Sequence, residues 1–163
     1  MPKQQHIGFS YSIYTSLDEL APEDQTLVLK ARKARKNAYA PYSNFQVGAA
    51  LLLNNNKVVL GANQENASFP SGLCAERVAV YAAGANFPEA ELQKVAICAA
   101  PIDKKSMTPA APCGACRQAL LEYELKQDKN IQVFLTGSHG EVWKLNSIKD
   151  LMPLIFDPKL LNS

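Results

Sequence analysis

Residues 94–101, KVAICAAP, are apolar at nearly every position, and this run limits the folds open to the chain. A strand that is exposed on one face alternates apolar and polar residues, whereas a continuous apolar run is typical of a strand buried on both faces of its sheet. The flanking segments 73–85 and 112–125 have the length and pattern of helices. Helices that alternate with strands favour a sheet enclosed between helical layers. The sequence therefore predicts an α/β fold.

The other elements follow from the same kind of pattern. Residues 21–39 predict a helix with Pro22 near its first position and acidic residues in its first turn. Further strands are expected in the segments 6–14, 41–53, 57–62, 131–136 and 141–146. Within the first of these, the apolar residues that share one face are Ile7, Phe9, Tyr11 and Ile13. The N-terminus is therefore expected to contribute a strand of its own.

The composition is that of an ordinary globular chain. Its 163 residues are 47% hydrophobic and 20% charged with a formal net charge of +2, which fits one domain and gives no reason to expect nucleic acid as a partner. The basic run at 30–36 is interpreted as a solvated helix face. No membrane partner is expected either, since no apolar run is long enough to cross a bilayer. The N-terminus lacks the apolar core of a signal peptide, so we expect a cytoplasmic protein, whose cysteines stay reduced.

Two cysteines three residues apart, Cys113 and Cys116, lie in the stretch PCGACR. Pro112 disfavours a helical conformation at Ala111, so a helix is expected to start at about Cys113 with both sulfurs on one side of its first turn. The free N–H groups and the positive dipole end of a helix stabilise thiolates. Taken alone, the pair leaves three interpretations open: half of a metal site, a redox dithiol, or structural residues.

Cys74 supplies a third sulfur, at the start of the helix expected over 73–85. Three thiolates can bind one Zn²⁺ at about 2.3 Å each and leave the fourth tetrahedral position open, which is the mark of a catalytic site. Candidates for a fourth ligand are weaker. Cys98 lies within the apolar strand and is interpreted as a core residue, and the two histidines have no ligand-like spacing. Cys74 and the CxxC pair therefore predict a zinc site with an open corner.

Glu76 and two arginines complete this predicted site. A carboxylate beside the metal can take a proton from water and return it elsewhere, although Glu76 alone is equally well explained as a first-turn residue favoured by the helix dipole. Glu76 and Cys74 face the same metal only if Cys74 is non-helical or first in its helix. Arg77 is expected to donate hydrogen bonds to the sulfurs, and Arg117 is the second candidate for that role. The alternative for each arginine is a surface salt bridge.

Four stretches of the chain together resemble a known family. Cys-Ala-Glu-Arg at 74–77 and Pro-Cys-x-x-Cys-Arg at 112–117 resemble the zinc nucleoside and nucleobase deaminases, although a cysteine stands here where their usual signature has histidine. YAPYSNFQVGAALL at 39–52 and NQENASFPSGLCAER at 63–77 are similar to the small cytidine deaminases that bind zinc through three cysteines. The motifs stand in the same order and at matching separations.

The resemblance runs from about residue 31 to residue 156 and implies both a fold and an assembly. The implied fold is a three-layer α-β-α sandwich with a five-stranded mixed sheet, and the implied assembly is a homotetramer whose active sites borrow residues from neighbouring subunits. The first twenty residues fall outside the likeness. We therefore divide the chain into an N-terminal extension over 1–20, which carries an extra strand, and one catalytic domain over 21–163. One Zn²⁺ per subunit is the implied cofactor.

The resemblance also implies which residues bind the substrate. Asn63 and Glu65 would hold the ribose hydroxyls, and Phe45 would pack against the pyrimidine. Ala75 would hydrogen-bond the base through its backbone, and Phe156 would reach the base of a neighbouring subunit. Without the family, Phe45 and Phe156 are better explained as core residues, and Asn63 and Glu65 as a turn at the end of a strand.

The implied reaction is the hydrolytic deamination of cytidine and deoxycytidine to uridine and deoxyuridine, a step of pyrimidine salvage that releases ammonia. Zinc lowers the pKa of its bound water from 15.7 towards about 7. Glu76 would carry the released proton to N3 of the base, the oxygen would add at C4, and Glu76 would then help to protonate the departing amine. Because Glu65 places a carboxylate beside the sugar, a free nucleoside is expected rather than a nucleotide.

Three alternatives are open at this point. The substrate of a zinc deaminase with these motifs could be a blasticidin-type antibiotic, guanine or a nucleic-acid base, although the sugar-binding pair and the small net charge disfavour a polynucleotide. A non-catalytic zinc module would use Cys98 as a fourth ligand. A CxxC redox protein would leave Cys74 and Glu76 without a role.

Overall fold

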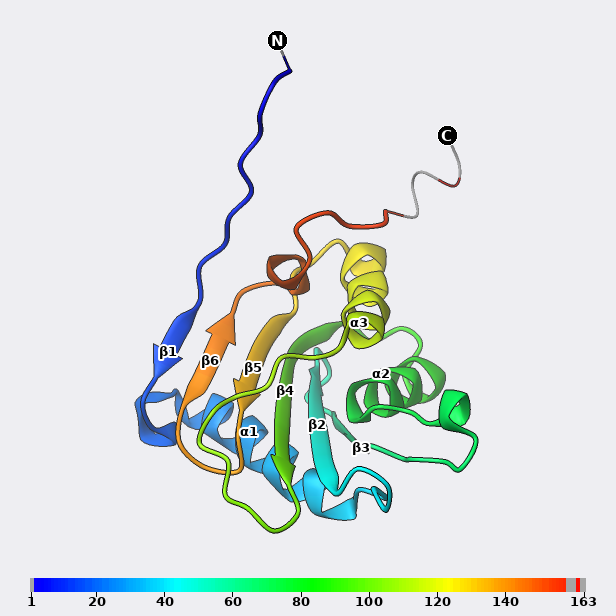
Figure 1. Cartoon of the computed structure of the whole chain (residues 1–163). Helices are drawn as coiled ribbons and strands as arrows, with labels where there is room; N and C mark the ends of the chain where they lie inside the picture. The colour runs from blue at the N-terminus through cyan, green and yellow to red at the C-terminus, as the bar shows by residue number, and fades with distance from the viewer. Residues whose placement is uncertain (1, 158–160, 162–163) are drawn as a thin grey trace.

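A computed structural model describes residues 2–157 and 161, and its centre is one six-stranded mixed sheet (Figure 1). The strands lie in the order β1-β6-β5-β4-β2-β3. Their bounds are β1 Ser12–Tyr14, β2 Phe45–Leu53, β3 Val58–Ala62, β4 Leu92–Pro101, β5 Gln132–Thr136 and β6 Val142–Leu145. Strands β4 and β5 are parallel and the other neighbouring pairs are antiparallel. The expected five-stranded mixed sheet with an added N-terminal strand is confirmed.

Helices cover both faces of the sheet (Figure 1). The α-helices are α1 Pro22–Ala34, α2 Ala75–Asn86 and α3 Gly114–Gln127, and the short 3₁₀ helices are η1 Leu17–Glu19, η2 Arg35–Asn37, η3 Phe69–Ser71 and η4 Ile148–Leu151. Helix α1 packs on one face, and α2 and α3 pack together on the other. Among the described residues, no helix has the length and apolar character needed to cross a lipid bilayer. The three-layer α-β-α arrangement is confirmed.

The apolar run of β4 is explained by its position between these layers. Val95 and Ile97 belong to the core under α2 and α3, whereas Ala96 and Cys98 belong to the core under α1. All four side chains are at most 1% exposed. Each of these four residues therefore has a helix above or below it, which is why this part of the strand does not alternate.

Two predicted strands are shorter in the structure than in the sequence pattern. Only Ser12–Tyr14 pairs with β6, because β6 itself is four residues long and the chain then turns toward η4. Tyr11 lies against Trp143, with their ring centroids 5.3 Å apart. Residues 41–44 form a turn and not the start of β2, and Asn44 has a left-handed φ of 54°. The strand expectation was wrong at both places, because a tight turn and the end of a partner strand override the local pattern.

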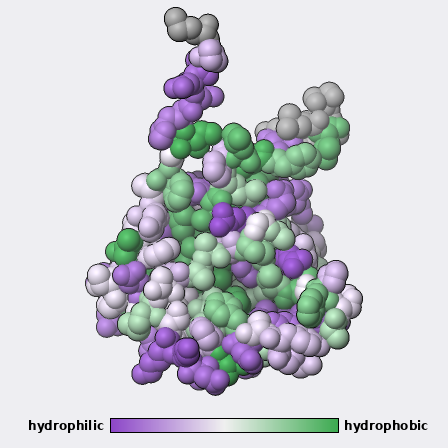
Figure 2. All heavy atoms as spheres, in the orientation of Figure 1, coloured by the Kyte–Doolittle hydropathy of each residue, from purple (hydrophilic) through white to green (hydrophobic). Residues whose placement is uncertain are grey.

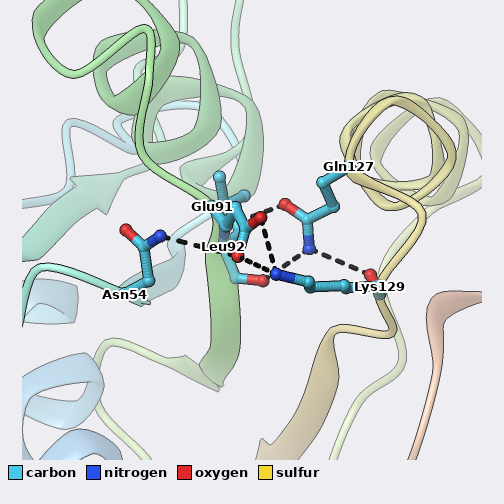
Figure 3. A network of polar contacts seen from close by, with 5 residues as sticks. All are labelled: Asn54, Glu91, Leu92, Gln127 and Lys129. Carbon is cyan, nitrogen blue, oxygen red and sulfur yellow. Dashed lines mark hydrogen bonds and ion pairs between the residues drawn. The ribbon is translucent and has the colours of Figure 1, made fainter.

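A polar network closes the corner where α3 gives way to β5 (Figure 3). The Gln127 side chain pairs with the backbone of Leu92, accepting from its N–H at 2.9 Å and donating to its carbonyl at 2.8 Å. Lys129 Nζ lies 2.8 Å from both carboxylate oxygens of Glu91. Figure 3 also shows Asn54, from the β2–β3 turn, directed at the same carboxylate. The network ties the end of α3 to the first residues of β4.

Two glycines of the β2–β3 hairpin let helices approach the sheet from opposite sides. A Cβ atom on Gly61 would lie 2.2 Å from the carbonyl oxygen of Ala75 and 2.7 Å from the backbone nitrogen of Ala79, both in α2. A Cβ atom on Gly48 would lie 2.2 Å from the backbone nitrogen of Arg35, directly after α1. The close contact at Gly61 fixes the start of α2, which carries the residues of the predicted site.

We expect the substitution Gly61→Ala to lower the free energy of unfolding by about 3 kcal/mol, since backbone atoms must move to admit the methyl group. For a chain of this size, that corresponds to a fall in Tm of roughly 6–12 °C, measurable by thermal unfolding followed by circular dichroism. Gly114→Ala is the control, because a Cβ atom there meets nothing within 4 Å. Equal melting temperatures for wild type and Gly61→Ala would contradict the packing argument.

Candidate metal centre and active site

Two helix starts carry the predicted metal ligands. Cys74 and Cys113 are the N-cap residues of α2 and α3, with extended backbone angles of φ −71°, ψ 154° and φ −66°, ψ 165°. Each cysteine therefore stands just before the free N–H groups of a first helical turn, which favour a negative charge. The prediction that Cys74 is non-helical is confirmed, and this conformation lets Cys74 and Glu76 face the same space.

The three sulfurs converge as the sequence predicts. Cys74 Sγ lies 3.9 Å from Cys113 Sγ, which lies 3.4 Å from Cys116 Sγ, and all three sulfurs are within 4.8 Å of one another. Cys116 is buried and Cys113 is exposed, so the group opens toward solvent on one side. Cys98 lies on the α1 side of the sheet, where its thiol faces the Gly137 carbonyl at 3.4 Å. Within the described residues, the metal-binding group comprises three sulfurs, and Cys98 is not among them.

The electrostatic environment favours ionised sulfur. The pKa of Cys74 falls to about 5, because the Cys116 thiol donates a hydrogen bond to it and Arg77 adds a second donor and a positive charge. The same shared proton raises the pKa of Cys116, to which burial contributes. Arg77 Nη2 lies 3.9 Å from Cys74 Sγ, and this contact raises the pKa of the arginine. The guanidinium of Arg77 is thus placed as the sequence analysis expects, beside a ligand sulfur.

Glu76 lies in the first turn of α2 with only 4% of its surface exposed. Burial raises the pKa of this carboxyl, and the charge of Cys74 raises it further. Its Oε2 atom is buried without a hydrogen-bond partner among the described residues. Buried carboxylate oxygens are normally paired, so an unpaired one beside three sulfurs marks a place where a bound molecule supplies the partner.

Arg117 has different partners from those expected. Its Nε donates to the Pro112 carbonyl at 2.8 Å and its Nη1 to the Leu151 carbonyl at 2.9 Å. It therefore joins the start of α3 to η4 through backbone oxygens, and it supports the cysteine pair by fixing the helix start. The one arginine bond to a sulfur in the described residues comes from Arg77.

The residues expected to bind the sugar precede Cys74 in the sequence and line the same cavity as Cys74. A cavity of about 430 Å³ is lined by Tyr42, Asn63, Glu65, Phe69, Cys74 and Arg77. That volume is within the range of small-molecule pockets. Asn63 is buried and pairs with the start of β2, accepting from Val47 N at 2.7 Å and donating to the Phe45 carbonyl at 3.0 Å. Glu65 accepts hydrogen bonds from the turn at 42–43.

Three other expected binding residues are differently placed. Ala75 is fully buried as the first residue of α2, between the ligand Cys74 and Glu76. Phe45 opens β2 and is 37% exposed. Phe156 lies beyond η4 in a segment without regular structure and is 55% exposed, so it is not a residue of this chain's own core. The interpretation of the two phenylalanines as core residues is wrong, because both are exposed in the single chain.

Sequence reasoning did not single out the aromatic pair of this cavity. The rings of Tyr42 and Phe69 meet edge to face at 5.7 Å between centroids. Ser43, which bonds to Glu65, was also overlooked. All three residues lie inside the stretches 39–52 and 63–77 that carry the family resemblance. Polar and aromatic residues in connecting segments often bind ligands, and that pattern could have identified them as candidate binding residues.

Comparison with known families agrees with this geometry. The family model described as "Cytidine and deoxycytidylate deaminase zinc-binding region" matches residues 21–131. The chain belongs to the cytidine and deoxycytidylate deaminase family. A cytidine deaminase from Halalkalibacterium halodurans is 39% identical over 138 residues, which span 85% of this chain and 97% of the relative. One from Sporosarcina psychrophila is 33% identical over 85% of this chain and 94% of its own length.

Solved structures of the family have the same fold. The crystal structure of a cytidine deaminase from Burkholderia pseudomallei superposes with a TM-score of 0.71 at 40% identity, covering 84% of this chain and 100% of that chain. A cytidine deaminase from Mycobacterium tuberculosis superposes with a TM-score of 0.65 at 30% identity, over 84% of this chain and 99% of the other.

The residues of this deaminase site fit a zinc ion. A tetrahedral ion with Zn–S distances of about 2.3 Å holds its sulfurs roughly 3.8 Å apart, close to the separations found between the three cysteines. The donor set is soft, as zinc prefers, and the exposed side of the group leaves a fourth position facing solvent. The unpaired Glu76 Oε2 lies beside that group, where a water bound to the ion would be its partner.

We expect the purified protein to carry about one zinc per chain, and Cys113→Ala to lower the zinc content below a tenth of that value, because two sulfurs cannot hold the ion tightly. Metal analysis by plasma mass spectrometry measures the content. Cys98→Ser is the matched control and should keep its full zinc complement. Loss of zinc from Cys98→Ser would instead support a closed four-cysteine site.

Proposed function

We propose that this chain is a zinc-dependent cytidine deaminase, which hydrolyses cytidine and deoxycytidine to uridine and deoxyuridine with release of ammonia in pyrimidine salvage. The observation that carries the proposal is the placement of Glu76, a buried carboxyl with a free oxygen beside three converging sulfurs. The family membership supports it, and so do the similar proteins from Halalkalibacterium halodurans and Burkholderia pseudomallei, both named cytidine deaminases.

Glu76 carries the protons of the proposed reaction. Zinc, when bound, supplies a water whose pKa is lowered to about 7 as the nucleophile. Glu76 would take one proton of that water and deliver it to N3 of the base, which makes C4 electrophilic. Once the oxygen has added at C4, Glu76 would take the second proton from that oxygen and give it to the amine. The C4–N bond then breaks as the C4 carbonyl forms, so that cytidine and water give uridine and ammonia. Burial raises the pKa of Glu76. A carboxyl whose pKa lies closer to the working pH accepts and returns protons more readily.

The remaining site residues would bind and orient the nucleoside. Asn63 and Glu65 would hold the ribose hydroxyls in the cavity that Cys74 borders. Phe45 would lie against the pyrimidine, and the backbone of Ala75 would hydrogen-bond the base next to Glu76. Each of these roles follows from the family resemblance, and the common cavity supports the roles of Asn63 and Glu65.

The proposed enzyme is a homotetramer. Tyr81 is 48% exposed on α2, and a groove that it shares with Ala115, Ala119 and Tyr123 runs between α2 and α3. Figure 2 shows apolar surface at the base of the N-terminal segment and along the segment after η4, where Phe156 is half exposed. Exposed apolar side chains that gather in this way are expected at a subunit interface. In the proposed assembly, Phe156 contacts the base bound by a neighbouring subunit.

The alternative functions have less support. A closed zinc module requires Cys98, which lies on the other side of the sheet. A redox protein gives no role to the buried Glu76, and the four cysteines are all free thiols. The division into an extension over 1–20 and a catalytic domain over 21–163 stays a prediction, as does the cytoplasmic location.

Glu76→Gln should lower kcat for cytidine by at least about 10²–10⁴, because the amide cannot accept and return the proton. The decrease in ultraviolet absorbance of cytidine measures turnover, and metal analysis should find zinc retained. Glu89→Gln, which changes an exposed glutamate away from the site, is the control. A Glu76→Gln variant with more than a tenth of wild-type turnover would refute the assigned role.

Glu65 should also make the enzyme prefer a nucleoside substrate to a nucleotide. Its carboxylate in the sugar cavity repels a phosphorylated sugar, so kcat/KM for cytidine should exceed that for CMP by at least about tenfold. Ammonia release from the two substrates under identical conditions measures the ratio. Comparable efficiencies would overturn the nucleoside assignment, and the same assay applied to guanine and blasticidin-type substrates tests the other deaminase alternatives.

A further inference from the structure

The hydroxyl of Ser43 connects two residues of the proposed substrate site. Ser43 Oγ donates to Glu65 Oε1 at 2.5 Å and accepts from the backbone nitrogen of Phe45 at 3.0 Å. A serine hydroxyl has one hydrogen and two acceptor positions, so this pair of bonds uses its donor and one acceptor. The Ser43 oxygen thus bridges the Glu65 carboxylate, which is proposed to bind the sugar, and the backbone of Phe45, the first residue of β2.

The same region is closed from the other side by Asn63. Its side chain donates to the carbonyl of Phe45, so both polar backbone groups of Phe45 bond to side chains of the site. The chain therefore contains a continuous polar path from Glu65 through Ser43 and Phe45 to Asn63. The groups proposed to bind sugar and base belong to one hydrogen-bonded unit.

From this path we infer that Ser43 is a positioning residue for sugar recognition, which aims the Glu65 carboxylate at the ribose hydroxyls. The inference rests on the proposed function, because it presumes that Glu65 binds the sugar. Ser43 itself is not expected to touch the reacting atoms, so its effect should appear in binding and not in the chemical step.

The turn that contains Ser43 fixes the orientation of the Glu65 carboxylate. Glu65 Oε2 accepts from the backbone N–H groups of Tyr42 at 2.9 Å and of Ser43 at 3.3 Å, while Oε1 accepts from the Ser43 hydroxyl. Asn44 then turns the chain with a positive φ into β2. With one oxygen fixed by the backbone and the other by the hydroxyl, rotation of the carboxylate is restricted, and acceptor capacity is left for a ligand hydroxyl.

The Ser43 bond also stabilises the charged form of Glu65. It is the largest of the interactions that lower the pKa of this carboxyl, followed by the bond from Tyr42 N. Loss of the hydroxyl should therefore raise the pKa of Glu65, which can be followed by carbon-13 NMR of the labelled side chain. A purely structural role of Ser43 elsewhere in the turn would leave that pKa unchanged.

The chain offers a matched control for the loss of such a bond. Ser147 Oγ donates to Glu124 Oε1 at 2.5 Å and accepts from Lys149 N at 3.1 Å, which repeats the arrangement of Ser43 at the start of η4. Ser147→Ala removes the same kind of hydroxyl bridge from a carboxylate that does not line the sugar cavity. It is expected to lower Tm without changing the preference among substrates.

The experiment compares cytidine with 2′,3′-dideoxycytidine, which lacks the hydroxyls that Glu65 would hold. For Ser43→Ala, KM for cytidine should rise about tenfold with kcat within about twofold of wild type, as expected when a bond to a charged group is lost from binding. kcat/KM for the dideoxynucleoside should change less than about twofold. Ser43→Thr keeps a hydroxyl and should restore the KM for cytidine. All variants are assayed well below their Tm.

The outcomes separate this inference from the function on which it rests. A wild type that releases no ammonia from cytidine overturns the proposed function and the inference together. Two results would overturn the inference alone, provided that the wild type is active. In the first, Ser43→Ala lowers kcat/KM equally for cytidine and for the dideoxynucleoside. In the second, Ser147→Ala changes the preference between these substrates as Ser43→Ala does. An unchanged KM for cytidine in Ser43→Ala also overturns it.

Discussion

Cys74 and Cys113 stand at two helix starts whose sulfurs lie 3.9 Å apart, and this approach constrains much of the molecule. Positive charge nearby stabilises sulfur ligands of a metal. The N–H groups of two first turns provide part of that charge, Arg77 adds its guanidinium beside Cys74, and a bound metal ion would add more. The helices can meet in this way only if α2 lies directly on the sheet. Gly61 permits that contact, because any side chain there would overlap with the backbone of α2.

The sheet links this metal centre to the proposed sugar site. Gly48 and Ala62 are paired in the hairpin, so the start of β2 and the end of β3 leave the sheet side by side. The chain after Ala62 then passes Asn63 and Glu65 before it reaches Cys74. Asn63 bonds back to β2 at both Phe45 and Val47, which holds this passage against the strand. The side chains proposed for sugar and base are thus held against the β2–β3 hairpin, and the segment that contains them leads directly to Cys74 at the start of α2.

Local sequence rules predicted the metal centre better than its surroundings. The N-cap position of Cys113 followed from Pro112, and the burial of β4 on both faces followed from an unbroken apolar run. The partners of Arg117 could not be foreseen, because they are backbone carbonyls of Pro112 and of a segment about thirty residues further along the chain. The turn at 41–44, where the sequence pattern predicts a strand, could not be foreseen for a related reason. Its conformation is determined by hydrogen bonds to Glu65, which is distant in sequence.

Two buried glutamates differ in how the described residues of the fold satisfy their carboxylates: Glu124 is fully paired, whereas Glu76, the proposed proton carrier, is not. Glu124 is 1% exposed, and donors from Ile131, Ser147, Ile148 and Lys149 reach its two oxygens. Glu76 is 4% exposed, yet its Oε2 has no partner among the described residues.

Burying a carboxylate without partners costs free energy, and the fold meets that cost at Glu124 by surrounding it with donors from the chain. At Glu76 the described part of the chain provides no such donors for Oε2, although the side chain is nearly as well buried. The difference is consistent with a carboxyl whose partner arrives with the ligand. A group that must exchange protons with water and with a base cannot be saturated by its own protein. The start of α2 thus places Cys74 and the free oxygen of Glu76 together, and the start of α3 brings Cys113 and Cys116 to them, so that the proposed metal ligands and the proposed proton carrier form one site.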